Sequence, residues 1–519
     1  MKTTLRNLLL SLAIGGACFL PRLACAQGGV PLWANRYHGP GSGNDYAYSI
    51  AVDGSNNVYV TGSSRGNNTN NDYATIKYSS EGVALWTNRY GGPYTAASDE
   101  FSGDIAYSVA VDTNGNVYVT GQSDFSSSSP DYATIKYSTT GVPLWTNRYG
   151  GALGGFDVAR SLAVDGIGNI YVGGGSAATG AGAPDYVTIK YSSAGIPLWT
   201  NRYNGPGNNT DSISDLAVDG DGNVYVTGYS TGSGTGQDYA TIKYSGAGVP
   251  LWTNRYNGVA NGRDQATAIV LDGIGNVVVT GGASTGGGSN NFVTIAYSTA
   301  GVPVWTNSYD GPENGDDFAL SMAADTNGNI FVTGYSSGSN GSYQSYDVVT
   351  IAYASASGVS MWTNRFNGTG NDADYPRPNS TAVDANGNVF VTCQSVGIGS
   401  SYDYAVIAYS VTGKHLWTNR YNGSGNSFDI PWSMAVDVNG NVYVTGSSGS
   451  DYATIKYGPT VALQIEKAGS EMVLSWANAA FGLQSAPFVS GTFTNVSGAT
   501  SPYTNSITGS QQFFRLKAN

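Results

Sequence analysis

The fold is decided by residues 45–62, which read DYAYSIAVDGSNNVYVTG, and by the segments DYATIKY at 72–78 and LWTNRY at 85–90. Short runs rich in β-branched and aromatic residues, separated by links that contain Gly and Asn, are typical of β-strands joined by tight turns. Residues 45–90 therefore predict one unit of four antiparallel strands, which we call strands a, b, c and d in chain order.

This unit recurs along the chain. The Trp of strand d returns at intervals of 53 to 59 residues, at Trp33, Trp86, Trp145, Trp199, Trp252, Trp305, Trp362 and Trp417. Four-stranded units of about this length are typical of the blades of a β-propeller. A solenoid with four strands in each rung is the alternative arrangement.

The two ends of the repeat array indicate how it closes. The array begins in a strand d at Pro31–Tyr37 and ends in a strand c at Asp451–Tyr457, with seven complete units between them. We expect the first strand to complete an eighth blade, because ring closure removes exposed sheet edges. The predicted fold class is thus all-β, with an eight-bladed β-propeller of four-stranded blades over residues 27–457.

Strand a is expected to lie innermost, around the axis of the propeller. Regular alternation would place small residues on one face of the first strand a (Ala47, Ser49 and Ala51) and large residues on the other (Tyr46, Tyr48, Ile50 and Val52). One small and one large face suit strands that crowd together, with the bulk of each blade nesting on the small residues of its neighbour.

The run IAVDGSNNVYVTG at 50–62, followed by YATIKY and LWTNRY, resembles the SBBP-type β-propeller repeat of secreted bacterial proteins. The resemblance extends over about residues 31–457. It implies a propeller fold in which the motif residues are mostly scaffold, and it implies no catalytic residues.

The segments outside the array predict export and a second, smaller domain. Residues 1–26 have the features of a signal peptide: Lys2 and Arg6, an apolar stretch at 8–20, and the small residues Ala-Cys-Ala at 24–26. The predicted location is extracellular or on the cell surface, with the periplasm as an alternative. Residues 458–519 contain β-like runs at 461–465, 472–476, 493–496 and 513–517, which predict a small β-sandwich-like module for sorting or attachment, or a passive cap.

The composition excludes some partners. The chain has 23 basic and 35 acidic residues, a net charge of −12, so it repels nucleic acid and anionic membranes. No later stretch is long and apolar enough to span a membrane. Cations, neutral sugars and other proteins remain as possible ligands.

The sequence offers few residues for catalysis. The chain has two His residues, His38 and His415, and the only cysteine outside the predicted signal, Cys393, replaces the Gly of a repeated VTG element. A thiol nucleophile needs an adjacent base, and no His is placed to serve Cys393. We therefore predict no catalytic residue and a protein that is not an enzyme.

One Asp opens every strand a, and this series is the most regular polar feature of the chain. Its members are Asp45, Asp104, Asp157, Asp211, Asp264, Asp317, Asp374 and Asp429. A ring of carboxylates at the mouth of the central channel could bind a hard cation such as Ca²⁺. In the alternative interpretation, each Asp caps a turn by accepting hydrogen bonds from nearby backbone N–H groups.

Departures from the repeat give the candidate ligand-binding residues. The loops after Tyr90 and Gly334 are longer than their counterparts, and the strand that follows Asp374 gains two residues. These segments supply the candidates Tyr94, Glu100, Phe101, Tyr343, Tyr346, Tyr375 and Arg377. Tyr amid Ser, Gly and Asn provides adaptable contact area, although ordinary variation of loop length is the alternative explanation.

These features predict a secreted or cell-surface scaffold that binds a protein or a glycan on its loop face without catalysis. The alternative is a carbohydrate-active hydrolase or lyase that uses Asp and Tyr on the same face. A purely structural component of the envelope or matrix is a third possibility. A dense acid cluster away from the repeated positions would favour the enzyme, whereas exposed Tyr without paired acids would favour binding.

Overall fold

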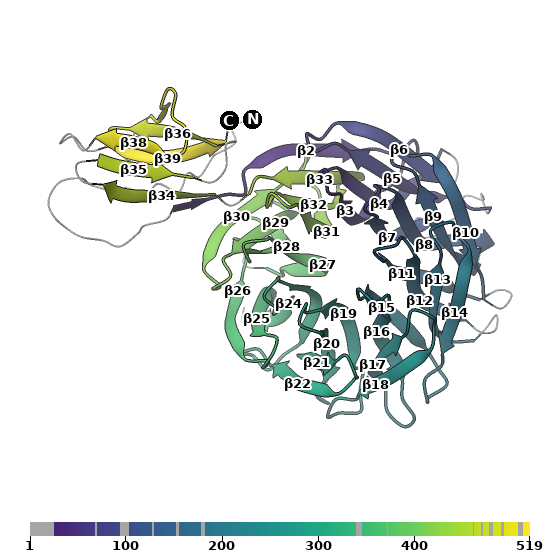
Figure 1. Ribbon diagram of the computed structural model, residues 1–519. Helices are drawn as coiled ribbons and strands as arrows, with labels where there is room; N and C mark the ends of the chain where they lie inside the picture. The colour runs from purple at the N-terminus through teal and green to yellow at the C-terminus, as the bar shows by residue number, and fades with distance from the viewer. Residues whose placement is uncertain are drawn as a thin grey trace.

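The computed structural model describes residues 25–67, 70–93, 103–126, 129–151, 155–177, 182–338, 345–370, 372–459, 461–468, 471–476, 481–488, 492–506 and 512–518. Within these residues the protein is all-β and contains no helix. Eight four-stranded antiparallel sheets are arranged as blades around a central axis (Figure 1). The predicted propeller is therefore confirmed, and the solenoid is excluded.

Seven blades are continuous in sequence, and each runs from its innermost strand a to its outermost strand d. Blade 1 contains β3 (Tyr46–Val52), β4 (Val58–Arg65), β5 (Asn71–Tyr78) and β6 (Ala84–Tyr90), and blade 2 contains β7 (Ile105–Val111), β8 (Val117–Ser126), β9 (Ser129–Tyr137) and β10 (Pro143–Tyr149). Blade 3 contains β11 (Asp157–Val164), β12 (Ile170–Ala177), β13 (Pro184–Tyr191) and β14 (Pro197–Tyr203), and blade 4 contains β15 (Asp211–Val218), β16 (Val224–Thr231), β17 (Gln237–Tyr244) and β18 (Pro250–Tyr256). Blade 5 contains β19 (Gln265–Leu271), β20 (Asn276–Ser284), β21 (Asn290–Ser298) and β22 (Pro303–Tyr309), and blade 6 contains β23 (Asp317–Ala324), β24 (Asn329–Gly338), β25 (Ser345–Ala354) and β26 (Ser360–Phe366). Blade 7 contains β27 (Tyr375–Val383), β28 (Val389–Val396), β29 (Tyr402–Tyr409) and β30 (His415–Tyr421).

Blade 8 joins the two ends of the array, as the sequence predicted. It contains β31 (Asp429–Val436), β32 (Val442–Ser448) and β33 (Asp451–Tyr457), and β2 (Pro31–Tyr37) is its outermost strand. The β2–β33 register runs from Pro31 opposite Tyr457 to Tyr37 opposite Tyr452. Gly29 takes the place of the missing turn, because its carbonyl accepts a hydrogen bond from Asn419 of blade 7.

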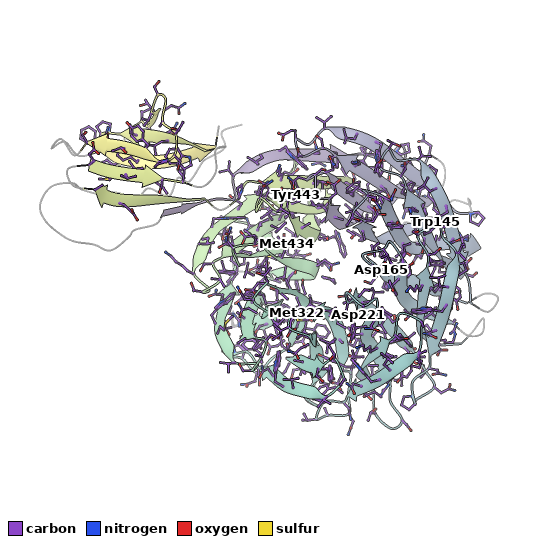
Figure 2. All side chains as sticks on the ribbon, in the orientation of Figure 1. Trp145, Asp165, Asp221, Met322, Met434 and Tyr443 are labelled. Atoms are coloured by element: carbon purple, nitrogen blue, oxygen red, sulfur yellow. The ribbon has the colours of Figure 1, made fainter. Side chains whose placement is uncertain are left out.

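Neighbouring blades are held together by the repeated residues of strands c and d. In blade 2, Trp145 Nε1 and Lys136 Nζ donate to the carbonyl of Ser193 in the c–d turn of blade 3, at 3.2 and 2.9 Å. Asn147 Nδ2 donates to the carbonyl of Gly195 in the same turn, at 2.7 Å. Figure 2 shows Trp145 on the outer rim, where strand d reaches the next blade. The motif therefore recurs because it forms the contact between blades.

Strand a departs from the regular alternation that the sequence predicted. In blade 1 the register shifts between Ala47 and Ser49, so that Tyr48 is bulged out of the ladder. The bulge reverses the alternation after it, and Ala47 packs in one core cluster with Ile50 instead of sharing a small face with Ala51. The assignment of Ala47, Ser49 and Ala51 to a single face was therefore wrong.

The glycine of the repeated VTG element is required by this bulge. A Cβ at Gly62 would lie 1.8 Å from the carbonyl oxygen of Tyr46 on strand a, far inside contact distance. Blade 7 carries the buried Cys393 at this position, opposite a strand whose irregularity extends from Pro376 to Thr381. The blade whose strand a has two extra residues is thus also the one blade that has a side chain in place of this glycine.

The residues after the propeller, joined by the short strand β1 that precedes it, form a smaller unit with two sheets. The first contains β1 (Cys25–Gln27), β34 (Val461–Ala468), β35 (Glu471–Ser475) and β38 (Tyr503–Ser506), and the second contains β37 (Thr494–Asn495), β36 (Phe481–Ala486) and β39 (Phe513–Ala518). Leu463, Leu474 and Leu516 belong to its common core. The predicted sandwich-like module is present, with β36 and β38 in addition to the four runs seen in the sequence.

Candidate ligand-binding site

The eight Asp residues that open strand a are all buried, with 0 to 2% of their surface exposed. In blade 1, Asp45 accepts hydrogen bonds from the backbone N–H of Gly39 and of Arg65, at 2.7 and 3.1 Å. The equivalent Asp211 accepts from Gly205 and Thr231. Each carboxylate thus points into the loop of its own blade, as the turn-capping interpretation predicts. Calcium binding by this series stays a prediction that the geometry does not favour.

Burial affects the protonation of these carboxyl groups. It raises the pKa of Asp104 and of Asp374 to about 6, although backbone and hydroxyl donors act in the opposite direction. A second Asp is repeated just after strand a; in blade 1 it is Asp53, and its pKa is shifted in the opposite direction. Burial of Asp53 opposes its ionisation, but the side-chain and backbone amides of Asn57 outweigh this and lower the pKa. Both series therefore act in turns.

Two of the candidates from the sequence, Tyr346 and Tyr375, lie together on the loop face of blades 6 and 7. Their ring centroids are 5.1 Å apart, and each lies near Tyr335, at 4.9 and 5.5 Å. Tyr335 also donates to Asp316 Oδ2 at 3.3 Å. We call Tyr335, Tyr346 and Tyr375 the tyrosine cluster; all three side chains are half-buried. The candidates Tyr94, Glu100, Phe101 and Tyr343 lie outside the described residues.

The bulges of strand a re-aim a second set of side chains, several of which line a central cavity. Each bulge occurs at the third residue after the strand-a Asp, and a wider irregularity includes the same position in blade 7. The residues at this position are Tyr48, Tyr107, Arg160, Ser214, Thr267, Leu320, Arg377 and Trp432. A bulge re-aims a side chain without disturbing the rest of the sheet. The scaffold is therefore repeated, while the residue that it presents differs from blade to blade.

Five of these residues contact one another across blades 3, 2, 1, 8 and 7. The Arg160 guanidinium lies 4.6 Å from the ring centre of Tyr107, and the Arg377 guanidinium lies 4.6 Å from that of Trp432. Tyr48 joins the two pairs, with ring centroids 5.7 Å from Tyr107 and 5.0 Å from Trp432. We call this row the aromatic ladder. Arg377, a candidate ligand-binding residue from the sequence, is its last member.

Buried donors mark the end of the ladder at blade 7. Arg377 Nε and Trp432 Nε1 are both buried without a hydrogen-bond partner. Burial lowers the pKa of Arg377, and Gln394 Oε1 accepts a hydrogen bond from Arg377 Nη2 at 2.9 Å. Buried donors without partners are uncommon in proteins. These two donors therefore have no acceptor within the described protein.

The ladder borders a cavity of about 280 Å³ that is lined by strand a of all eight blades. Tyr107 and Arg160 line one side of the cavity, and Ser214 and Thr267 line another. Figure 2 shows Met322 and Met434, which also line it, toward the inner ends of their blades. Blades 2 and 3 thus contribute the aromatic and cationic side chains of the cavity lining, and hydroxyl side chains such as Ser161, Ser214 and Thr267 lie beside them.

Asp215 is a carboxylate within this cavity. Six equivalent positions in other blades hold Ser, and in blade 1 Ser49 Oγ accepts the N–H of Val109 from the next blade at 3.2 Å. Asp215 accepts a hydrogen bond from the N–H of Ile269 in the next blade at 3.1 Å and another from the hydroxyl of Ser161 at 3.0 Å. Burial raises the pKa of Asp215 to about 6. The substitution places an acceptor of raised pKa where most blades have a hydroxyl.

Sequence reasoning missed Tyr335, Asp215 and all members of the ladder except Arg377. The signal was present in the alignment of the repeats with one another, because the third residue after the strand-a Asp varies more than its neighbours do. Regular alternation hid this position, since an unpaired bulge residue was counted as part of a strand face.

Among the described residues, one group of three possible metal ligands lies within 4.8 Å: His38, Asp45 and Asp451. Two of its members are repeated scaffold residues, and Asp451 pairs with Arg36 of β2 at 2.9 Å. Over the described residues, no helix has the length and apolar character needed to cross a membrane.

Comparison with known families gives five matches to the beta-propeller repeat named SBBP, at residues 36–68, 86–126, 198–234, 311–342 and 416–453. An uncharacterized WD repeat-containing protein, L264, of Acanthamoeba polyphaga mimivirus is 24% identical over 272 residues. That match includes 47% of this chain but only 16% of the viral protein.

Solved structures share the architecture at low identity. The crystal structure of quinohemoprotein alcohol dehydrogenase from Comamonas testosteroni aligns with a TM-score of 0.52 at 11% identity, over 83% of this chain and 76% of that one. The WD40 beta propeller domain of Doa1 aligns with a TM-score of 0.41 at 11% identity, over 82% of this chain and 96% of that one. At such identity the first likeness shows the fold alone.

Proposed function

This chain belongs to the SBBP family of β-propeller repeats, and from that premise we propose that it is a non-enzymatic binding or scaffold protein whose ligand lies on the loop face. The propeller fold supports a binding or scaffold role in general. The finer assignment, to a protein or glycan ligand at the cell surface, is our proposal. The proposal includes export, for which the signal-like residues 1–26 are the support.

The observation that carries the proposal is the tyrosine cluster next to Arg377 and the aromatic ladder. Aromatic rings offer a large rigid contact area at small entropic cost, and Tyr adds a hydroxyl for hydrogen bonding.

The test is capture of glycans and envelope proteins by the purified chain, with Tyr335→Ser as the variant. Tyr229 in blade 4 occupies the same position as Tyr335 in its VTG element and is not in ring contact with another aromatic residue of the described chain. Tyr229→Ser is therefore the matched control. We expect Tyr335→Ser to reduce capture at least several-fold and Tyr229→Ser to leave it unchanged. Equal capture by both variants would count against the tyrosine cluster as the binding surface.

A further inference from the structure

We propose that the central cavity and the aromatic ladder bind an acidic oligosaccharide, with one acid group held by Arg160, which lines the cavity, and another held by Arg377, at the other end of the ladder. This inference rests on the proposed binding function and names the chemical class of its ligand. It concerns residues of the channel, whereas the proposed function can be met by the tyrosine cluster alone.

The first argument comes from the arginines. The Arg residues of strand d are each paired with an Asp of strand c, as in Arg255–Asp238 at 2.7 Å and Arg148–Asp131 at 3.0 Å. Within the described residues, Arg160 and Arg377 form no ion pair with a carboxylate, although the protein has a large excess of acid. Two cations without acidic partners at one channel indicate that an anion from outside the protein completes the site.

The second argument comes from the arrangement of polar groups around the cavity. The lining next to Arg160, in blades 4 and 5, presents the hydroxyls of Ser214 and Thr267 together with the carboxyl of Asp215. Hydroxyl and carboxyl groups are suitable partners for sugar hydroxyls, while the rings of Tyr48 and Trp432 can pack against the apolar face of a sugar. An acidic peptide would pair with the two arginines but would leave the hydroxyls of Ser214 and Thr267 without partners.

The third argument is size. The cavity of about 280 Å³ lies just below the range of roughly 300–1,000 Å³ that is usual for ligand pockets. It accepts one or two sugar rings and excludes a folded segment of another protein. We therefore infer that the terminal acidic residue of a glycan enters the channel, and that the next ring lies against the ladder.

The experiment is calorimetric titration of the full-length protein with trigalacturonic acid and with its fully methyl-esterified form. The ester keeps the ring and the hydroxyls and removes the charge. A sulfated trisaccharide distinguishes a sulfate from a carboxylate as the acid group, and a hexaglutamate peptide tests the peptide alternative. The variants are Arg160→Gln and Arg377→Gln. Arg263→Gln is the control, because Arg263 is an exposed cation of a d–a loop that contacts Gln237.

We expect an acidic trisaccharide to bind at least about tenfold more tightly than the ester, because charge-assisted hydrogen bonds are the stronger kind. Each channel variant should lose most of this difference, and Arg263→Gln should keep it. Equal affinity for acid and ester, or unchanged affinity in both channel variants, would overturn the inference. Equal binding of hexaglutamate would overturn the sugar assignment. If Tyr335→Ser abolishes capture while no acidic sugar binds the channel, the proposed function stands and this inference fails.

Discussion

Ring closure by β2 should make Trp33 more important to stability than its counterpart Trp145. Trp33 Nε1 donates to the carbonyl of Ser80 in blade 1 at 3.1 Å, and its ring centroid lies 6.0 Å from both Tyr78 and Tyr443. Trp145 makes the corresponding contacts within the continuous part of the chain, and both side chains are half-buried. The two variants Trp33→Ala and Trp145→Ala therefore remove nearly the same local interactions.

The local loss is about 2 kcal/mol for each variant, since a fully buried Trp→Ala change costs about 3–5 kcal/mol and these rings are half-exposed. Only β2 lacks a covalent turn to its own blade. When Trp33 is removed, the remaining contacts of β2 can open together, including Asn35 with Gly82 and Arg36 with Ser448. At about 1 kcal/mol for each hydrogen bond, we expect an extra loss of about 2 kcal/mol for Trp33→Ala.

The assay is thermal denaturation with limited proteolysis at the N-terminus, because a repeat protein of this size need not unfold in two states. Trp33→Ala should melt at a lower temperature than Trp145→Ala and should be cut early near β2. Deletion of residues 27–38 should have the largest effect, including aggregation through the exposed edge of β33. Equal melting temperatures for the two point variants would refute the reasoning, because closure would then add nothing to an ordinary contact between blades.

Three further predictions follow from the described side chains. Asp215→Ser should stabilise the protein by about 1–2 kcal/mol at pH 7 and have no effect near pH 4, because burial raises the pKa of Asp215 to about 6 and the stability present below its unfolded pKa is lost as the pH rises through 6. Equal effects at both pH values in denaturation curves would contradict this. Gly228→Ala should destabilise blade 4 by about 3 kcal/mol or more, since the added Cβ would lie 2.1 Å from the carbonyl oxygen of Ser212, whereas Cys393→Ala should cost about 1 kcal/mol. Comparable melting temperatures for the two variants would disprove the link between bulge and glycine. Melting curves in EDTA and in millimolar calcium should coincide, because the strand-a Asp residues already accept backbone N–H groups, and a rise in melting temperature with calcium would support the carboxylate ring instead.

Much of the architecture was predictable because the repeat is written into the local sequence. Eight copies of strand patterns, joined by turns rich in Asp, Gly and Asn, predict four-stranded blades, and the displaced strand d at Pro31–Tyr37 predicts closure. The turn-capping role of Asp53 was also predictable, since Asp accepts backbone N–H groups two and four residues later. Interactions of this kind depend on neighbours in sequence, so that the sequence alone specifies them.

The candidate site was only partly predictable, because its contacts join residues from different blades. Tyr346, Tyr375 and Arg377 were found as departures from the repeat, but Tyr335 and the ladder were not. Tyr48 and Trp432 lie almost four hundred residues apart in sequence and have ring centroids 5.0 Å apart only because the ring closes. The bulge that turns Tyr48 toward the channel is a property of strand pairing, and no single strand sequence shows it. The sequence by itself thus determined the blade, its turns and the closing strand, whereas the tertiary structure alone decided which side chains share the central channel, because only the closed ring brings the eight bulges together.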